Sequence, residues 1–195
     1  MARPSARIRQ LLARVLAEQT EASPPVSPTT AYERLRNLAS PYRETLTATG
    51  ELTPFEYRVF SQNGEDGVIA EILRRIGASS RFFVEFGVGE GLEGNCILLA
   101  DVFGWSGLFI EADDAWFAAL EAKYRYSPHV RTVRALVTPS NVNDLFAAAD
   151  VPDEPDVLSI DIDTHDYWVW DAIVGYRPRL VVIEYNAALD PEARL

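Results

Sequence analysis

From about residue 55 onward, short apolar runs alternate with longer stretches whose apolar residues recur every three or four positions. A continuous apolar run predicts a buried strand, and the wider spacing predicts a helix that packs by one face. The runs predict strands over residues 82–86, 108–111, 130–136, 157–161 and 180–184. The spaced stretches predict helices over residues 65–76, 92–103, 114–124, 142–149 and 167–174.

This alternation predicts an α/β fold with a doubly wound, mostly parallel sheet. Strands that are apolar throughout need cover on both faces, and the intervening helices supply it. Such sheets bind ligands beyond the carboxyl ends of their strands, near the point where the strand order reverses. Polar residues that follow the predicted strands are therefore the first candidates for function.

The sequence predicts a helical extension over residues 1–54 ahead of a domain over residues 55–195. The segment 5–19 has apolar residues at helical spacing with arginines near the other face, residues 23–28 form a proline-rich linker, and residues 30–38 predict a short helix. The first helix fits an organelle-targeting peptide, a membrane-surface helix, or a helix that packs on the domain or on a partner. Packing is favoured because Glu18 and Glu21 follow closely and a large aromatic anchor is missing.

Three alternating glycines follow the strand predicted at 82–86. Glu85 precedes Gly87, Gly89 and Gly91, and glycines of this kind let backbone N–H groups approach a ligand closely. A dinucleotide loop needs a further glycine at the sixth position, where this chain has Leu92. Glu85 would also repel a pyrophosphate, whereas it suits an ammonium group. The alternative is a tight turn without a ligand.

A second acid lies at the distance expected for a nucleotide-binding fold. Glu111 ends the next predicted strand, about twenty residues after the glycines, where such folds place an acid for the ribose hydroxyls. The alternative is an acid that interacts with the start of the next helix.

Composition excludes several classes of function. The net charge of −11 disfavours a surface that tracks phosphates, so nucleic acid is not an expected partner. The single cysteine, Cys96, rules out an intrachain disulfide, favours a cytoplasmic protein and fits a small core residue. No apolar run reaches the length of a membrane span.

Three successive blocks, residues 61–66, 83–87 and 158–163, resemble those of class I S-adenosylmethionine (SAM) methyltransferases of the FkbM type or a related one. The similarity covers roughly residues 60–186 and implies a Rossmann-like fold. It further implies that Glu111 holds the ribose of SAM. The residues implied to hold the methionine end are Glu85, Gly87, Gly89 and Gly91. Gln62 and Asn95 are further candidates for contacts with the cofactor, with helix capping as the alternative.

Acids follow the fourth and fifth predicted strands. In an extended strand Ser159, Asp161 and Asp163 share one face, and Glu184 and Asn186 end the neighbouring strand if the sheet order resembles that of the family. These oxygen ligands suit Mg²⁺, which could bind a substrate hydroxyl and lower its pKa. The alternative is that Asp161 and Asp163 cap the next helix.

His165, with Asp163 beside it, is the candidate catalytic residue. Methyl transfer requires that the acceptor be positioned and lose its proton, which a histidine base could accept. Neighbouring carboxylates favour protonated histidine unless a metal or substrate offsets them. His129 lacks such neighbours and is interpreted as structural, and the aromatic residues Trp168 and Trp170 are expected to pack in the core.

Class I methyltransferases usually carry two further strands, whereas this chain ends at Leu195. Either the sequence is a C-terminally incomplete fragment, or the N-terminal segment or a second copy in a homo-oligomer covers the open sheet edge, because an uncovered edge invites association.

The resemblance implies SAM-dependent methylation of an oxygen on a small-molecule or sugar-containing metabolite, with SAM as the cofactor and Mg²⁺ as a candidate metal. Two alternatives stay open. Leu92 disfavours an NAD(P)-dependent oxidoreductase, and a non-catalytic protein could keep the cofactor fold as an assembly surface.

Overall fold

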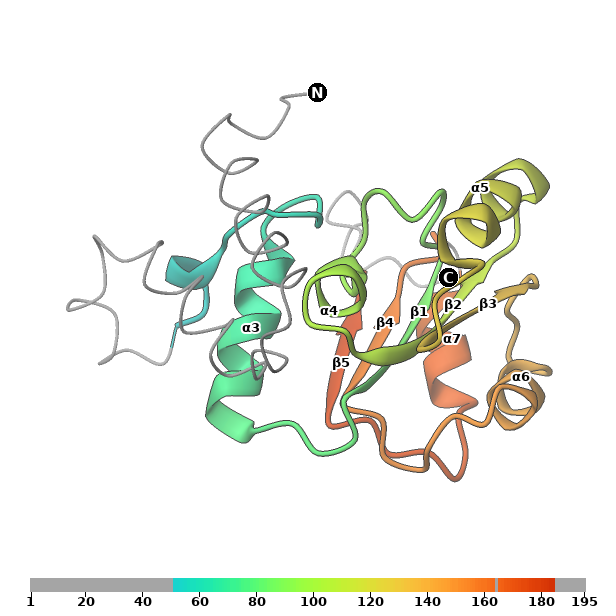
Figure 1. The fold of residues 1–195 in the computed structure, drawn as a ribbon. Helices are drawn as coiled ribbons and strands as arrows, with labels where there is room; N and C mark the ends of the chain where they lie inside the picture. Colours follow the sequence, from blue (N-terminus) through green and yellow to red (C-terminus); the bar gives the residue numbers. More distant parts are fainter. Residues whose placement is uncertain (1–50, 164, 185–195) are drawn as a thin grey trace.

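The computed structural model describes residues 51–163 and 165–184. Five strands form one sheet: β1 (Phe82–Phe86), β2 (Ser106–Glu111), β3 (Val130–Arg134), β4 (Val157–Ile160) and β5 (Leu180–Ile183). The helical elements are the 3-10 turn η2 (Thr53–Phe55), α3 (Glu65–Ile76), α4 (Ile97–Asp101), α5 (Asp114–Tyr124), α6 (Val142–Ala148) and α7 (Asp166–Asp171). Figure 1 shows the sheet at the centre, with the helices around it.

The sheet is parallel throughout, with strand order β3-β2-β1-β4-β5. The order reverses between β1 and β4, which is the ligand-binding switch point of a Rossmann-like fold. The structure therefore confirms the predicted doubly wound α/β fold. The extension over 5–19, 23–28 and 30–38 lies outside the described residues.

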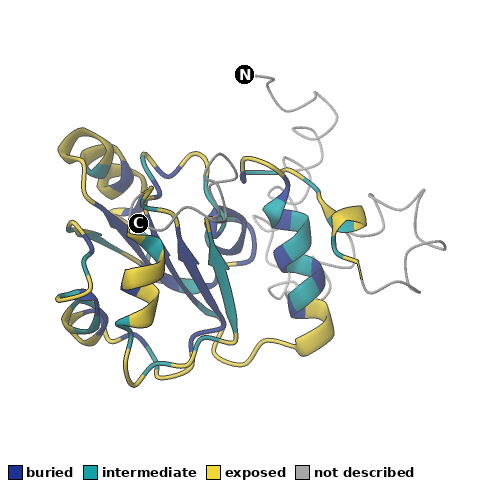
Figure 2. Ribbon diagram, turned by 180° about the vertical axis from the view of Figure 1, so that it is seen from behind, coloured by how far each residue is buried: buried dark blue, intermediate teal, exposed yellow. Residues whose placement is uncertain are grey.

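Alternate strand residues build two hydrophobic cores, one on each face of the sheet. Phe83, Phe109 and Val157 join the core beneath α3, α4 and α5. Their sequence neighbours Val84 and Leu108 join the core beneath α6 and α7. Figure 2 shows that the central strands are buried. Burial on both faces explains why these strands are apolar throughout.

The same alternation decides where the polar residues at the strand ends lie. Glu85, Glu111 and Ser159 are each two residues beyond a side chain of the first core, so they face α3, α4 and α5. All three are at most 5 % exposed. The carboxyl ends of β1, β2 and β4 thus gather buried polar groups on one face of the sheet.

Several predicted boundaries are confirmed and one helix is clearly wrong. The helices over 65–76 and 114–124 and the strand over 82–86 have the predicted ends. Apart from the start of α4, the other ends coincide with the prediction or differ from it by one to three residues. The helix predicted from residue 92 begins only at Ile97. The loop before it is held by long-range bonds, because Gly94 donates to the carbonyl of Phe60 and the next two backbone N–H groups donate to Glu85.

Two aromatic residues of α7 do not pack in the core as predicted. Trp168 and Trp170 are 60 % and 44 % exposed, and Val169 is the buried residue between them. Their rings instead make edge contacts with Tyr167, at centroid distances of 5.2 Å and 6.4 Å. The short helix buries Val169 in the second core and exposes most of its remaining surface (Figure 2).

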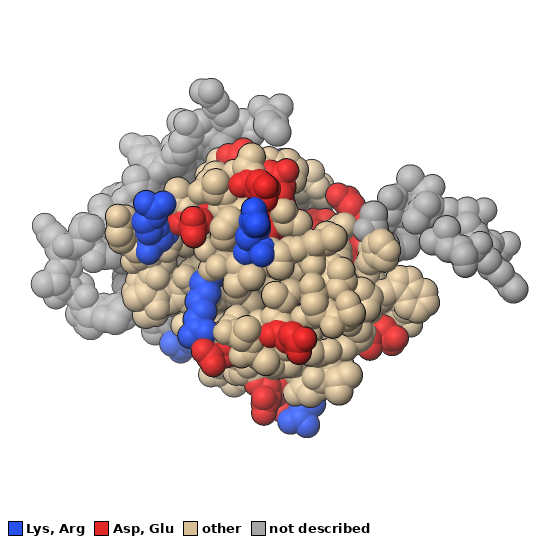
Figure 3. Space-filling view, turned by 90° about the vertical axis from the view of Figure 1, so that its right-hand side faces the viewer, with Lys and Arg blue, Asp and Glu red and all other residues tan. Residues whose placement is uncertain are grey.

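Two further features of the described residues are the distribution of charge on the surface and the apolar length of the helices. On the face drawn in Figure 3, Lys and Arg side chains stand among Asp and Glu and do not gather into one basic patch. None of the helices in the described part of the chain has the length and apolar character needed to cross a membrane.

Candidate functional site

The three alternating glycines have positive φ angles of 72°, 57° and 74°, but their surroundings differ. A Cβ at Gly87 would overlap the backbone carbonyl oxygen of Asp161, and one at Gly91 would lie 2.7 Å from Cδ1 of Leu120. A Cβ at Gly89 would meet nothing within 4 Å. Gly87 and Gly91 are therefore required by packing inside the protein, whereas Gly89 borders open space that a ligand could fill.

Glu85 lies beneath this loop with both carboxylate oxygens engaged. One oxygen accepts a hydrogen bond from the backbone N–H of Asn95 (2.7 Å) and the other from that of Cys96 (3.0 Å). Cys96 is the N-cap residue of α4, so the carboxylate occupies the start of that helix. Burial raises the pKa of Glu85 to about 7, despite these two bonds. Cys96 is itself fully buried, as predicted for a core residue.

Asn95 connects the glycine loop to β4. Its side-chain amide donates to Oγ of Ser159 (3.0 Å), and Ser159 lies 3.5 Å from the nearer oxygen of Glu85. The structure places Asn95 in this partly buried network, and its contact with a cofactor stays a prediction. Gln62, the other candidate, is exposed in the turn before α3.

Glu111 binds the glycine loop directly. Its Oε2 accepts from the backbone N–H of Gly89 (2.7 Å), and its Oε1 accepts from those of Ala112 and Asp113 (both 2.8 Å). The N-cap of α5 is Asp113, whose side chain accepts two backbone bonds of that helix. Glu111 is therefore not the helix cap, and it lies beside the open space at Gly89.

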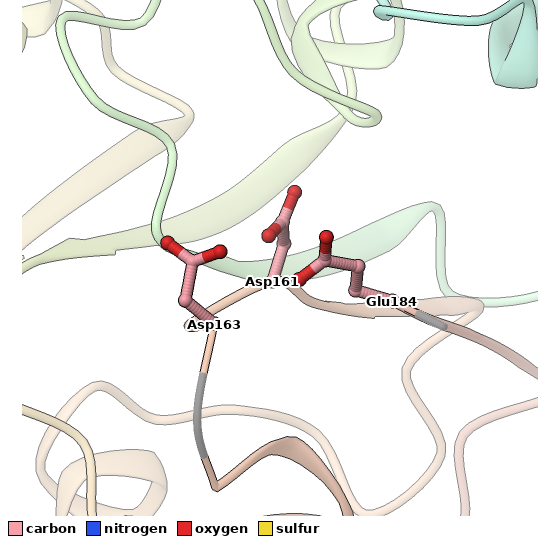
Figure 4. A group of neighbouring side chains, drawn as sticks. All are labelled: Asp161, Asp163 and Glu184. Atoms are coloured by element: carbon pink, nitrogen blue, oxygen red, sulfur yellow. The ribbon is translucent and has the colours of Figure 1, made fainter. Parts of the chain in front are cut away.

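Asp161, Asp163 and Glu184 come together at the ends of β4 and β5. One carboxylate oxygen from each lies within 4.8 Å of the other two, and all three residues are exposed (Figure 4). Partial burial, followed by the charges of Glu184, Asp163 and Asp166, raises the pKa of Asp161 to about 6. Three carboxylates this close repel one another, so a cation would stabilise the group. The predicted fourth ligand, Asn186, lies outside the described residues.

The route by which Asp163 joins this cluster differs from the prediction. Strand β4 ends at Ile160, and Asp163 has a φ of 66°, so it is directed by the turn rather than by strand alternation. The acid that bonds to the turn before α7 is Asp166, which accepts from the N–H of Ile162 (2.9 Å). Neither cluster acid is the N-cap of α7, because that position is His165.

His165 is exposed at the start of α7, two residues after Asp163. Its carbonyl accepts from the N–H of Val169 in the first turn. Its position at the edge of the acid cluster is compatible with a base, and that role stays a prediction. His129 is exposed before β3, and its carbonyl accepts from the N–H of Gly107.

The sequence interpretation gave no role to Asp66. This aspartate in the first turn of α3 is 2 % exposed and accepts hydrogen bonds from the turn over 59–61. Ser61 also bonds to it through its hydroxyl (2.7 Å). The signal that could have revealed the pair is a serine placed five residues ahead of an acid at a predicted helix start.

An open hollow of about 390 Å³ lies elsewhere, near the amino ends of β1, β2 and β3. His129, Arg131 and Asp150 contribute to its wall, and the last two form an exposed ion pair at 2.8 Å. Doubly wound folds bind ligands at the opposite, carboxyl ends of their strands. The site described above is therefore the better candidate.

No family model matches the sequence, and no curated protein matches it. The solved structures that are similar to this chain include the following two. Fibrillarin of Aeropyrum pernix, with natively bound S-adenosyl-L-methionine, is 11 % identical over 46 % of this chain and 36 % of its own, with a TM-score of 0.35. An O-methyltransferase from Bacillus cereus in complex with SAH is 13 % identical over 91 % of this chain and 64 % of its own, with a TM-score of 0.40.

This chain therefore spans less than two thirds of the length of either protein. Likenesses this distant carry no functional conclusion.

Replacing Gly87 by alanine should destabilise the protein much more than replacing Gly104 by alanine. Both glycines have positive φ, but a Cβ at Gly104 meets nothing within 4 Å. Gly104→Ala should cost about 1–2 kcal/mol of unfolding free energy from backbone strain alone. Gly87→Ala adds the overlap with Asp161, worth roughly 1–3 kcal/mol more. Urea unfolding measures both; equal losses would contradict the packing role of Gly87.

Stability should fall as pH rises from about 4.5 to 7, because folding raises the pKa of Glu85 from an ordinary 4.5 to about 7. The folded protein then holds a proton that the unfolded chain releases, so ionisation costs on the order of 3 kcal/mol. Burial also raises the pKa values of Asp66 and Asp161, so their ionisation lowers stability in the same direction. Burial raises the pKa of the nearby Cys96 thiol as well, so the thiol stays protonated. Glu85→Gln should flatten urea-unfolding stability across this range.

The control for the pH experiment is Glu90→Gln, because Glu90 is an exposed acid of the same loop. It should keep the wild-type pH dependence. An unchanged slope in Glu85→Gln would show that the carboxylate is not the titrating group.

Proposed function

We propose that this protein is a SAM-dependent methyltransferase that methylates an oxygen of a small-molecule or sugar-containing metabolite. The observation that carries the proposal is the pairing of Glu85 with the start of α4. A pyrophosphate cofactor needs the N-terminus of the helix after the glycines. Here that N-terminus begins late, at Ile97, and a buried carboxylate already occupies it.

The same arrangement suits a cofactor that has an amino-acid end and no phosphate. Acidic groups beneath the glycine loop favour an ammonium. Glu111 now accepts a hydrogen bond from the backbone N–H of Gly89. When SAM binds, the ribose hydroxyls would donate to this carboxylate in place of that N–H. Gly87 and Gly91 shape the loop, and Gly89 leaves room for the ligand.

SAM, when bound, supplies a methyl group on a positively charged sulfur. The protein has to position the acceptor oxygen and remove its proton. Asp161, Asp163 and Glu184 lie next to the glycine loop, since Gly87 contacts the backbone of Asp161. Their separation fits the hard-oxygen coordination of Mg²⁺, which would hold an acceptor hydroxyl and lower its pKa. His165 would then accept the proton.

A non-catalytic protein that keeps the fold as an assembly surface is the second candidate. The outward aromatic side of α7 favours it, because exposed aromatic groups are typical of protein interfaces. Turnover separates the two proposals, since an assembly surface would bind the cofactor without transferring its methyl group.

SAM should bind saturably to the purified chain, and NAD should not. Gly89→Arg should weaken SAM binding at least ~100-fold, because the new side chain fills the space beside the loop. Gly104→Arg is the matched control: this glycine also has positive φ and open surroundings, but it lies before β2. Calorimetric titration measures all three proteins. Binding of NAD without SAM, or equal affinity in Gly89→Arg, would overturn the proposal.

Divalent-ion binding should depend on the acid cluster. Asp161→Asn and Glu184→Gln should each weaken Mn²⁺, used as a probe for Mg²⁺, by at least ~10-fold because a charged ligand is lost. SAM affinity should stay within about threefold of wild type, since neither substitution alters the glycine loop. Asp171→Asn, which removes an exposed acid of α7, is the control. Unchanged Mn²⁺ affinity in both cluster variants would remove the metal from the mechanism.

A further inference from the structure

Asp66 is a buried carboxylate with one oxygen that has no hydrogen-bond partner. Its Oδ2 accepts from the backbone N–H groups of Val59 (2.9 Å), Phe60 (2.8 Å) and Ser61 (2.7 Å). Its Oδ1 accepts none. Among the buried side-chain polar atoms of the described residues, Trp105 Nε1 is the other one without a partner. A buried carboxylate oxygen without a donor costs stability, so it calls for an explanation.

Asp156 shows how this fold satisfies a buried aspartate elsewhere. It is also fully buried and accepts from backbone N–H groups of a nearby turn, those of Ser79 (2.9 Å) and Arg81 (2.6 Å). Both of its oxygens are engaged, and Arg179 pairs with it at 3.2 Å. Asp66 has the same backbone bonds on one oxygen but neither a cation nor a donor on the other.

The carboxylate of Asp66 lies against the cofactor end of the sheet. The turn that it binds is joined to the glycine loop, because Gly94 donates to the carbonyl of Phe60 (3.2 Å). Arg58 and Glu93 add an ion pair at 2.7 Å between the same two segments. Gly94 also lies against the carboxylate of Glu85, because a Cβ there would be 3.1 Å from Oε1, so one glycine contacts both the turn that Asp66 binds and Glu85.

Glu85 and Asp66 differ in which of their oxygens are already bonded. Glu85 is the acid that the sequence pattern assigns to an ammonium, but both its oxygens hold the loop before α4. Oδ1 of Asp66 is the neighbouring acceptor that still lacks a donor. An ammonium would satisfy it better than water, because it supplies donors and a positive charge to offset the two buried acids.

We propose that Oδ1 of Asp66 binds the ammonium group at the methionine end of the cofactor. This inference rests on the proposed function and assigns a binding residue to the same site. Oδ1 is closed to solvent in the structure, so the ammonium reaches it when the glycine loop shifts. Gly89 has open surroundings, since a Cβ there would meet nothing within 4 Å, and it gives that part of the loop room to move.

The test uses a pair of ligands that differ in one group: S-adenosylhomocysteine and its analogue that lacks the α-amino group. Calorimetry should find that wild type binds the analogue about 10- to 100-fold more weakly. Asp66→Asn should bind the two ligands with nearly equal affinity, since its amide offers no charge to the ammonium. Asp156→Asn alters the equivalent buried aspartate at the other end of the sheet and should keep the wild-type difference.

The outcomes separate this inference from the proposed function. Wild type that binds neither SAM nor S-adenosylhomocysteine would overturn both. Binding of S-adenosylhomocysteine and its analogue with equal affinity would leave the cofactor site standing and overturn the role of Asp66. An undiminished ligand difference in folded Asp66→Asn would do the same.

Should Asp66→Asn fail to fold, Glu85→Gln decides the question. A preserved preference for the amino group in this variant would support Asp66 as the binding residue. A lost preference would assign the ammonium to Glu85 and overturn the inference.

Discussion

The hydrogen bonds that Glu85 accepts from the backbone N–H groups of Asn95 and Cys96 set the geometry of this site. They join the end of β1 to the start of α4 across the whole glycine loop. A carboxylate in that position sets where the helix begins and holds the loop before it. It also excludes a phosphate from the place where dinucleotide-binding proteins hold one. A single buried charge thus determines both the local structure and the kind of cofactor that the loop suits.

The negative charge is then repeated along one edge of the sheet. Asp66, Glu85 and Glu111 lie buried on the side of α3, α4 and α5, and a second, exposed group follows β4 and β5. Acids gathered in this way would repel one another, so the arrangement favours cationic ligands. We propose two cations: the ammonium of the cofactor at the buried acids, and a divalent metal at the exposed group.

Local patterns predicted the fold well because apolar spacing is dictated by the two cores. The helix over 65–76 and the strand over 82–86 have the predicted ends, since each is bounded by a glycine or by a change in burial. The start of α4 could not be read locally, because a residue more than ten positions away determines it. The burial predicted for Trp168 and Trp170 was wrong because aromatic character indicates burial only on average, whereas in α7 the buried residue is Val169.

The site was predicted in part. Composition and spacing indicated Glu85, Glu111 and the acid cluster, but they could not reveal that Glu85 is bonded to the chain itself. Asp66 was missed because its significance lies in an absent bond, which only three-dimensional contacts disclose.

The close approach of Gly87 to the carbonyl of Asp161 puts the backbone of the glycine loop in contact with the backbone of the acid cluster. A shift of Gly87 would therefore displace the backbone of Asp161, the first residue of the acid cluster, and the reverse would hold too. Thermodynamic reciprocity follows: if filling one half changes the affinity of the other, the factor is the same in both directions. The order in which the site fills would then be a property of this one close approach between two strands.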